Sequence, residues 1–492
     1  MSALDEIRAE RLKKLELLKE KGMDPYPART TRTHEIKDVL ANFETLSDAS
    51  EVFSVAGRIR AARHHGGSAF FDIEDGTGRI QAYLKRDLVG EEVFDLFEAA
   101  VDLGDIVEVK GEAFLTKHGQ QSVQVASWRM LTKTLRPIPD EWYGLHDEDE
   151  RYRRRYLDLL LNKDTAELAV KRSKFWNAMR SYLLERDFVE VETPVLENTT
   201  GGADARPFVT HHNALDIDVY LRISAGELWQ KKLLVGGLPK VFEIGRIFRN
   251  EGISREHLQD YTQMEFYQAY SDYEAGKQMV ADMYRHIART AFGTTKFTIN
   301  EHEVDLEKEW ETYDFCKMIE EAYGISPLNT SVEEIEPVLR TAGIEYDAKT
   351  LNVERGVDLL WKKIRKSISG PGFLVGVPVY LEPLAKRRED NPETVERFQI
   401  LFAGSEMGKG FSELNDPVDQ RERFMAQQAL RDAGDDEAQM ADMEYVEALE
   451  YGMPPAFGFG LSERVFSFLA GVDVREGQLF PLMRPRDTGA EA

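Results

Sequence analysis

Hydrophobic positions near the start of the chain recur at the spacing of an amphipathic helix. Leucine and isoleucine side chains fall on one face, at Leu4, Ile7, Leu15 and Leu18, and Gly22 ends the pattern. Charged residues of both signs occupy the positions between them. We therefore predict a surface helix that packs on a neighbouring element, within an N-terminal helical extension of residues 1–50.

Apolar and polar positions alternate in short runs between residues 51 and 135. Five runs have strand character, FSVAGRIR, AFFDIED, RIQAYLK, DIVEVKGEAF and QSVQVASWRML, and a helical segment, Glu92–Ala100, separates the third from the fourth. This order is typical of an OB-fold β-barrel, which commonly binds single-stranded nucleic acid. Candidate contacts are Arg58, Phe70 and Gln81, because an aromatic ring can stack on a base while polar groups read its edge. Ordinary sheet packing is the alternative for each.

A linker with prolines and an acidic run, residues 136–150, precedes a larger domain of residues 151–492. Two helices and a strand open this domain, at Arg151–Leu161, Thr165–Arg186 and Phe188–Leu196. The segment from about 300 to 370 has a mixed α/β pattern, typical of an insertion, and no chemistry is assigned to it.

A predicted hairpin has the polar positions best suited to a binding site. In its second arm, Thr262, Met264 and Phe266 alternate with Tyr261, Gln263, Glu265 and Tyr267. The spacing of two sends the two sets to opposite faces, so one set can be buried while the other faces a ligand. The first arm leads into Arg249, whose guanidinium can bind a phosphate, and Glu251, which can accept an amine. An exposed, salt-bridged hairpin is the alternative.

The composition restricts the class of protein. A chain of 492 residues, 42% of them hydrophobic, is long enough for roughly two to four domains with large cores. The net charge of −25 argues against a surface coated with nucleic acid, although a local basic face remains compatible with RNA. The single cysteine, Cys316, excludes an internal disulfide, and no apolar run approaches membrane-spanning length. We expect a cytoplasmic protein without a membrane partner.

Three further segments contain candidate groups. Glu406 and Glu413 flank a glycine-containing turn in FQILFAGSEMGKGFSELND, and two facing carboxylates can hold hydrated Mg²⁺ beside substrate phosphates. Arg464 follows a glycine-rich turn, and its guanidinium can lie across an aromatic plane. Glu227 stands at a predicted helix start, where capping alone can explain a carboxylate.

In chain order, these segments resemble the class II lysyl-tRNA synthetases, from about residue 50 to Pro485. Phe188–Leu196 is similar to the first class II motif, Phe248–Glu265 to the second and Gly458–Arg464 to the third. GGADARPFVTHHNALD, VFEIGRIFRNEGIS and GFSELND are more similar to the lysine members than to the aspartate or asparagine members. The resemblance implies an α+β catalytic domain with a mostly antiparallel sheet, an anticodon-reading barrel, and a homodimer formed through the helix and strand around Phe188.

The resemblance also implies roles for the candidate residues. ATP would contact Arg249, Glu251, His257, Tyr261 and Arg464, with the two arginines catalytic. Mg²⁺ would bind Glu406 and Glu413. Lysine would contact Gly202, Glu227, Glu265, Tyr267 and Asn415, while the anticodon of tRNA(Lys) would contact Arg58, Phe70 and Gln81.

Several positions depart from the usual pattern of this family. Glu256 stands where an arginine usually precedes the motif histidine, and Lys409 stands where asparagine is frequent. The third motif reads GLSER, with Glu463, where GIDR is usual, and the segment VGVPVYLEPLA has Tyr380 and Glu382 where a glutamate and a serine are usual. SAGEL contains one residue more than the common form.

The implied function is ATP-dependent ligation of lysine to tRNA(Lys) through a lysyl-adenylate, with release of pyrophosphate and AMP. An aspartyl- or asparaginyl-type synthetase is one alternative, but it would need cationic groups for a side-chain carboxylate. A nucleic-acid-binding paralogue without catalysis is another, but it would be expected to have lost Arg249, Arg464 or the two metal-site glutamates.

Overall fold

The computed structural model describes residues 3–139, 145, 147–203, 205–252, 254–432 and 439–486. The chain divides into two compact units, Met1–Glu148 and Asp149–Ala492. The division falls inside the predicted linker, part of which, residues 140–144 and 146, lies outside the described residues. Among the described residues, no helix is long and apolar enough to cross a membrane.

The first unit is the predicted OB-fold barrel with its helical extension. Its helices are α1 (Ala3–Glu20), α2 (Ile36–Ala41), α3 (Phe43–Asp48), α4 (Arg86–Val89) and α5 (Glu91–Ala100). Its strands are β1 (Val52–His65), β2 (Ser68–Glu74), β3 (Arg79–Lys85), β4 (Ile106–Leu115) and β5 (Gln121–Thr132), closed in the order β1-β2-β3-β5-β4. Phe71, Phe97 and Trp128 pack in its core, so α5 covers the barrel from the position that the sequence predicted.

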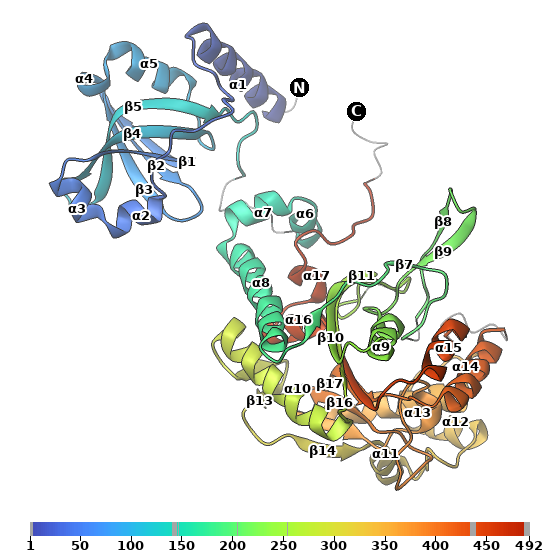
Figure 1. Ribbon diagram of the computed structural model, residues 1–492. Helices are drawn as coiled ribbons and strands as arrows, with labels where there is room; N and C mark the ends of the chain where they lie inside the picture. The colour runs from blue at the N-terminus through green and yellow to red at the C-terminus, as the bar shows by residue number, and fades with distance from the viewer. Residues whose placement is uncertain are drawn as a thin grey trace. The chain divides into compact units, whose positions relative to one another are not determined.

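The second unit is built on an eight-stranded sheet, ordered β14-β15-β16-β17-β18-β11-β10-β6 (Figure 1). Its strands are β6 (Val189–Glu190), β10 (Lys240–Phe248), β11 (Asp260–Ala269), β14 (Glu311–Asp314), β15 (Gly372–Val375), β16 (Arg397–Phe402), β17 (Ser405–Ser412) and β18 (Ala456–Ser462). Neighbouring strands are antiparallel except for the two edge pairs, β14 with β15 and β10 with β6. The α+β class with a mostly antiparallel catalytic sheet is thereby confirmed.

Small sheets and helices surround this sheet. The small strands are β7 (Leu196–Glu197), β8 (Val209–His212), β9 (Ile217–Leu221), β12 (Lys296–Ile299) and β13 (His302–Asp305). The helices are α6 (Glu148–Arg153), α7 (Arg155–Leu161), α8 (Lys163–Leu184), α9 (Glu227–Val235), α10 (Tyr273–Ile287), α11 (Phe315–Tyr323), α12 (Val332–Thr341), α13 (Val353–Ile364), α14 (Pro417–Asp432), α15 (Met443–Glu450), α16 (Arg464–Ala470) and α17 (Val474–Gly477), with short helical turns at Ala288–Phe292, Arg365–Ser367 and Val379–Leu381.

Alternate residues of β11 enter two separate cores. Met264 and Phe266 are fully buried against α8, α10 and α16 on one face of the sheet. Tyr267 packs in the other core, with α9, α11 and α13. The predicted alternation is therefore present, but the polar set also contains buried members, because helices cover this face as well.

The single strand predicted for Phe188–Leu196 is wrong. It consists of two short strands in different sheets, since β6 pairs with β10 and β7 pairs with β9. The reason is local: the Thr193 amide donates to the Glu243 carboxylate at 3.0 Å, and Pro194 has no amide hydrogen to donate.

Candidate active site

The floor of the site is a part of the sheet without side chains. Gly458 of β18 pairs with Tyr267 of β11 and with Phe411 of β17, and Gly460 pairs with Glu265 and Lys409. A Cβ at position 458 would collide with Glu413 Oε1 and with the Tyr267 ring. Glycine therefore leaves room above β18 for the polar side chains of its two neighbours.

Four charged side chains meet above this floor, and we call them the acid cluster: Glu227, Lys231, Glu265 and Glu413. All are at most 6% exposed. The Lys231 ammonium lies 2.7 Å from Glu227 Oε1 and 2.5 Å from Glu413 Oε2. Glu265 accepts from the Ala225 amide at 2.9 Å and from the Tyr267 hydroxyl at 2.9 Å. Two of the three carboxyls thus share one ammonium, and the third, Glu265, has only neutral hydrogen-bond donors.

Burial sets the protonation of this cluster. Burial, followed by the charge of Glu227, raises the pKa of Glu265 to about 7. Burial also raises the pKa of Glu413 to about 8, although Lys231 opposes that rise. For Lys231, burial lowers the pKa, but the carboxylates of Glu227 and Glu413 outweigh it and raise the pKa overall. Near neutral pH, the cluster without a ligand therefore retains a proton that an incoming cation would displace.

The structure brings most of the predicted lysine contacts to this cluster. Gly202 has φ +84°, and a Cβ there would lie 2.8 Å from Glu227 Cβ, so its backbone approaches the cluster closely. Asn415 has other partners, since it accepts from Lys386 Nζ at 2.8 Å and donates to the Met453 carbonyl at 3.3 Å.

Sequence reasoning missed Lys231 and assigned Glu413 to the metal alone. Lys231 follows Glu227 by four residues on α9, and this spacing on a predicted helix is a usable signal for an ion pair. A second missed group is Glu197, whose pKa burial raises to about 7. Its Oε1 accepts from Trp229 Nε1 at 2.9 Å, while its buried Oε2 has no hydrogen-bond partner among the described residues.

All five residues predicted to contact ATP line one cavity, which we call the arginine cavity. Its lining is Arg249, Glu251, Glu256, His257, Leu258, Tyr261, Ser462, Glu463, Arg464 and Val474. The Arg249 guanidinium lies 5.8 Å from the centre of the Tyr261 ring and donates through Nε to the Ile223 carbonyl at 3.2 Å. Burial, followed by the charge of Arg464, lowers the pKa of His257, so its imidazole is neutral at neutral pH.

Glu406 and Glu413 reach the same face of the sheet through a β-bulge. Residues seven positions apart on a regular strand face opposite sides, but the β16–β17 register shifts by one residue between Gln399 and Leu401. Gly408, with φ +131°, lies in the bulged segment of β17. Despite this shared face, Glu413 lies in the acid cluster, and Glu406 lines a different pocket.

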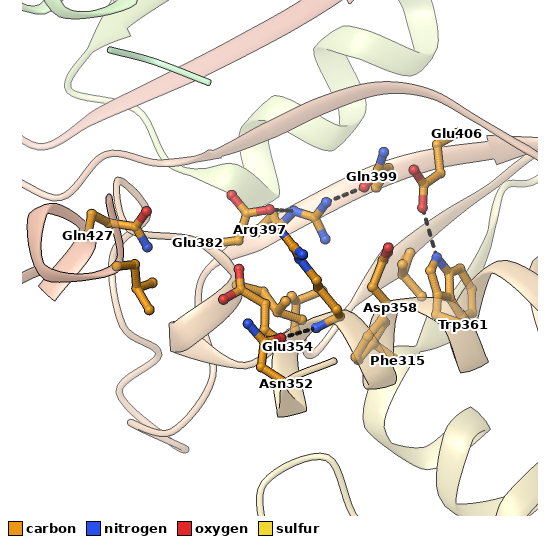
Figure 2. Close-up of a pocket in the computed structure, with 15 residues that line it drawn as sticks. Phe315, Asn352, Glu354, Asp358, Trp361, Glu382, Arg397, Gln399, Glu406 and Gln427 are labelled. Carbon is orange, nitrogen blue, oxygen red and sulfur yellow. Dashed lines mark hydrogen bonds and ion pairs between the residues drawn. The ribbon is translucent and has the colours of Figure 1, made fainter. Parts of the chain in front are cut away.

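Figure 2 shows the pocket that Glu406 lines, which we call the Glu406 pocket. Glu406 Oε1 accepts from the Trp361 indole of α13 at 2.8 Å. Arg397 bonds Glu382, with 2.7 Å from Nε to the carboxylate, and also bonds Gln399. Lys409, a departure from the family pattern, lies 3.1 Å from Glu382, another departure, so the two changes form an ion pair.

The barrel has its own candidate site, the barrel face. Its lining includes Phe70 and Gln81 together with Arg63 and three histidines, at positions 64, 65 and 118. Phe70 stacks on Tyr83 with ring centres 4.6 Å apart. Arg58 is not part of this lining, because its guanidinium donates to the Gly104 carbonyl at 2.8 Å. Arg63, which pairs with Phe70 across β1 and β2, lines the barrel face.

Comparison with known proteins agrees with this geometry. Residues 147–484 match the model of the class II tRNA synthetases (D, K and N), and residues 53–131 match the OB-fold nucleic acid binding domain of the tRNA anticodon type. The lysine–tRNA ligase of Roseiflexus castenholzii is 45% identical over 489 residues, 98% of this chain and 100% of the relative.

Two further relatives have similar lengths. The lysine–tRNA ligase of Thermosipho africanus is 42% identical over 98% of this chain and 97% of its own. That of Moorella thermoacetica is 43% identical over 99% of both chains. Together with the antiparallel sheet, the arginine cavity and the barrel, these matches show that the chain belongs to the class II tRNA synthetases of the aspartate, lysine and asparagine group.

Proposed function

We propose that this chain is a lysine–tRNA ligase, which joins lysine to ATP as an adenylate and then transfers it to tRNA. The acid cluster supports lysine as the substrate. The cluster has three buried carboxyls and a single ammonium, that of Lys231, which pairs with Glu227 and Glu413 but not with Glu265, so the pocket has a deficit of positive charge. A second ammonium, that of the substrate, would correct this deficit, whereas a neutral side chain would not.

The same cluster disfavours the aspartate and asparagine alternatives. A side-chain carboxylate would require an available cation, but Lys231 is already paired with Glu227 and Glu413. Placing a further carboxylate beside three buried acids would cost several kcal/mol, to order of magnitude. A paralogue without catalysis is disfavoured because Arg249, Arg464 and both glutamates of β17 and its end are present.

Adenylation requires alignment and charge neutralisation. The carboxylate of lysine is ionised at neutral pH, so it attacks the α-phosphate without a general base, and pyrophosphate leaves. Arg249, which contacts the Tyr261 ring and the Ile223 carbonyl, would neutralise charge where both groups meet. In the second step, a ribose hydroxyl of tRNA attacks the adenylate carbonyl, and AMP leaves.

Glu406 and Glu413 are the proposed ligands of Mg²⁺, and they share one face of the sheet although Glu406 lines its own pocket and Glu413 lies in the acid cluster. Each retains one oxygen, since Glu406 uses Oε1 for Trp361, and Glu413 Oε1 is buried without a hydrogen-bond partner among the described residues. Carboxylate oxygens are preferred ligands of this ion. When bound, Mg²⁺ would neutralise phosphate charge, as the arginines do.

The barrel face would bind the anticodon of tRNA(Lys). Phe70 and Tyr83 offer a stacking surface, and Arg63 and Gln81 lie beside it to contact base edges or phosphates. This activity belongs to translation, and we place the enzyme in the cytoplasm.

A homodimer is also part of the proposal. Val170 and Leu184 of α8 are 57% and 50% exposed, and Val189 of the edge strand β6 is 48% exposed. Exposed apolar side chains beside an unpaired strand edge are suited to a second copy of the chain. Val189→Lys should convert the dimer to a monomer in analytical ultracentrifugation, and a wild-type monomer would contradict the proposal.

A panel of amino acids in pyrophosphate exchange tests the substrate. Lysine with ATP and Mg²⁺ should give exchange, whereas aspartate and asparagine should not. Exchange driven by aspartate and not by lysine would refute the proposed function.

A further inference from the structure

Two departures from the family motifs meet at Arg464. Glu256, in the loop after the first hairpin arm, forms an ion pair with Arg464 Nη2. Glu463 is only 3% exposed and accepts hydrogen bonds from Arg172 and from Gln478 Nε2, the latter at 2.7 Å. Because Arg464 begins α16, the anchoring of Glu463 fixes its backbone, while Glu256 holds its guanidinium.

The contact of Glu256 is at the edge of the guanidinium. The face of the Arg464 guanidinium lies over the Phe468 ring, 5.3 Å from its centre, and its buried Nε has no hydrogen-bond partner among the described residues. An edge-on carboxylate leaves the guanidinium face opposite Phe468 available for stacking, which the flexible point charge of lysine does not offer.

The backbone holds Glu256 in place. Its amide donates to Ser254 Oγ at 3.2 Å. The neighbouring Arg255 bonds Asp473 at 2.9 and 3.0 Å, and its carbonyl accepts from the Val474 amide at 3.1 Å. The loop is therefore fastened to α17, so the carboxylate meets Arg464 at a defined place.

We propose that Glu256 is a positioning residue for ATP, which holds Arg464 by its edge so that the guanidinium face is set for the adenine ring. This proposal rests on the proposed function, since it requires Arg464 to contact the nucleotide. An acid in a cavity for a polyphosphate is otherwise unfavourable, because its charge repels the phosphates. The ion pair with Arg464 offsets that charge.

The test is steady-state pyrophosphate exchange with the full chain carrying Glu256→Gln or Glu256→Asp. Glu256→Gln should raise the KM for ATP about tenfold, because the stacking arginine loses its charged partner. The KM for lysine should stay within about twofold of the wild type. Glu256→Asp, which keeps the charge, should recover part of the loss. An unchanged or lowered KM for ATP would overturn the proposal, and so would an equal rise for both substrates.

Glu307→Gln is the matched control, because it removes a similarly exposed glutamate–arginine ion pair, with Arg289, that lies outside the arginine cavity. It should leave the KM for ATP within about twofold of the wild type. Arg464→Ala tests the proposed function separately. If Arg464→Ala abolishes exchange and Glu256→Gln has no effect, the positioning role alone fails. If Arg464→Ala retains full exchange, the nucleotide assignment fails, and the positioning role fails with it.

Discussion

The acid cluster and the arginine cavity share strand β11 but hold their charges in different ways. In the acid cluster, strand register and helix α9 place every group, and all four side chains are buried. In the arginine cavity, Glu256 comes from a loop and its ion-pair partner Arg464 from the start of α16. The side chain of Glu256 remains 41% exposed. In the proposed function, the charges fixed by the sheet would select a substrate by charge, whereas the charges on the loop would orient a larger ligand.

Arg249→Ala should have the largest effect on catalysis, because the proposed function has Arg249 contact both substrates. Exchange should fall about a thousandfold, the size typical of a lost transition-state donor. Binding of tRNA, measured by filter retention, should be unchanged. The control is Arg246→Ala, which alters an arginine that bonds Asp260 on the neighbouring strand. A normal exchange rate in Arg249→Ala would refute its role.

Lys231→Met should show that the acid cluster is a structural unit as well as a pocket. Removal of the ammonium leaves buried carboxyls without a cation, so the free energy of unfolding should fall by about 3–5 kcal/mol. Denaturant unfolding measures this change. Lys232→Met is the control, because this neighbour is 3.9 Å from its acidic partner, Asp442, and should change stability by less than about 1 kcal/mol. Equal losses in both variants would contradict the difference in burial.

Phe70→Ala should reduce tRNA charging without affecting pyrophosphate exchange, because Phe70 lies on the barrel face and not in the acid cluster or the arginine cavity. The kcat/KM for tRNA charging should fall about tenfold to a hundredfold, since one stacked base contributes roughly 1–3 kcal/mol. Exchange without tRNA should be unaffected. Arg63→Ala should also weaken charging, while Arg58→Ala should change it little because its guanidinium bonds Gly104. Equal loss of exchange and charging in Phe70→Ala would exclude a separate anticodon role.

The pH dependence of KM should differ between lysine, in the acid cluster, and ATP, in the arginine cavity. We expect this effect to be smaller than those of the substitutions above. Burial raises the pKa of Glu265 to about 7 and of Glu413 to about 8, so protons compete with the lysine ammonium as the pH falls. The KM for lysine should therefore rise about threefold to tenfold between pH 8 and pH 6.5, while the KM for ATP changes less. Glu265→Gln should flatten the profile. A KM for lysine that decreased toward low pH would contradict this account.

The sequence predicted those parts of the molecule that depend on local pattern. Strand alternation gave the opposite faces of β11, and helical spacing gave the start of α9 at Glu227. The family resemblance then predicted the five ATP contacts, and all five residues line the arginine cavity.

Features that depend on distant contacts could not be predicted in this way. Glu413 joins Lys231 only because β17 and α9, far apart in sequence, meet above the same floor. Arg58 and Arg63 are five positions apart and would face opposite sides of a regular strand, but the register shift between Ile59 and Ala61 brings them to the same face. Only Arg63 lines the barrel face, because Arg58 lies farther along the strand and bonds the Gly104 carbonyl. Such a shift has no signature in alternation alone.

Gly408 lies in the bulge of β17, where the loss of a single residue would change the direction of neighbouring side chains. A Cβ there would lie 2.7 Å from the Phe459 ring and 2.9 Å from the Tyr284 hydroxyl, so the extra residue of β17 cannot be exchanged freely. Deletion of one residue between Glu406 and Glu413 would restore regular alternation and turn Glu406 toward the opposite core. Natural or engineered variants should therefore tolerate insertions elsewhere in the second unit more readily than a single deletion in this strand.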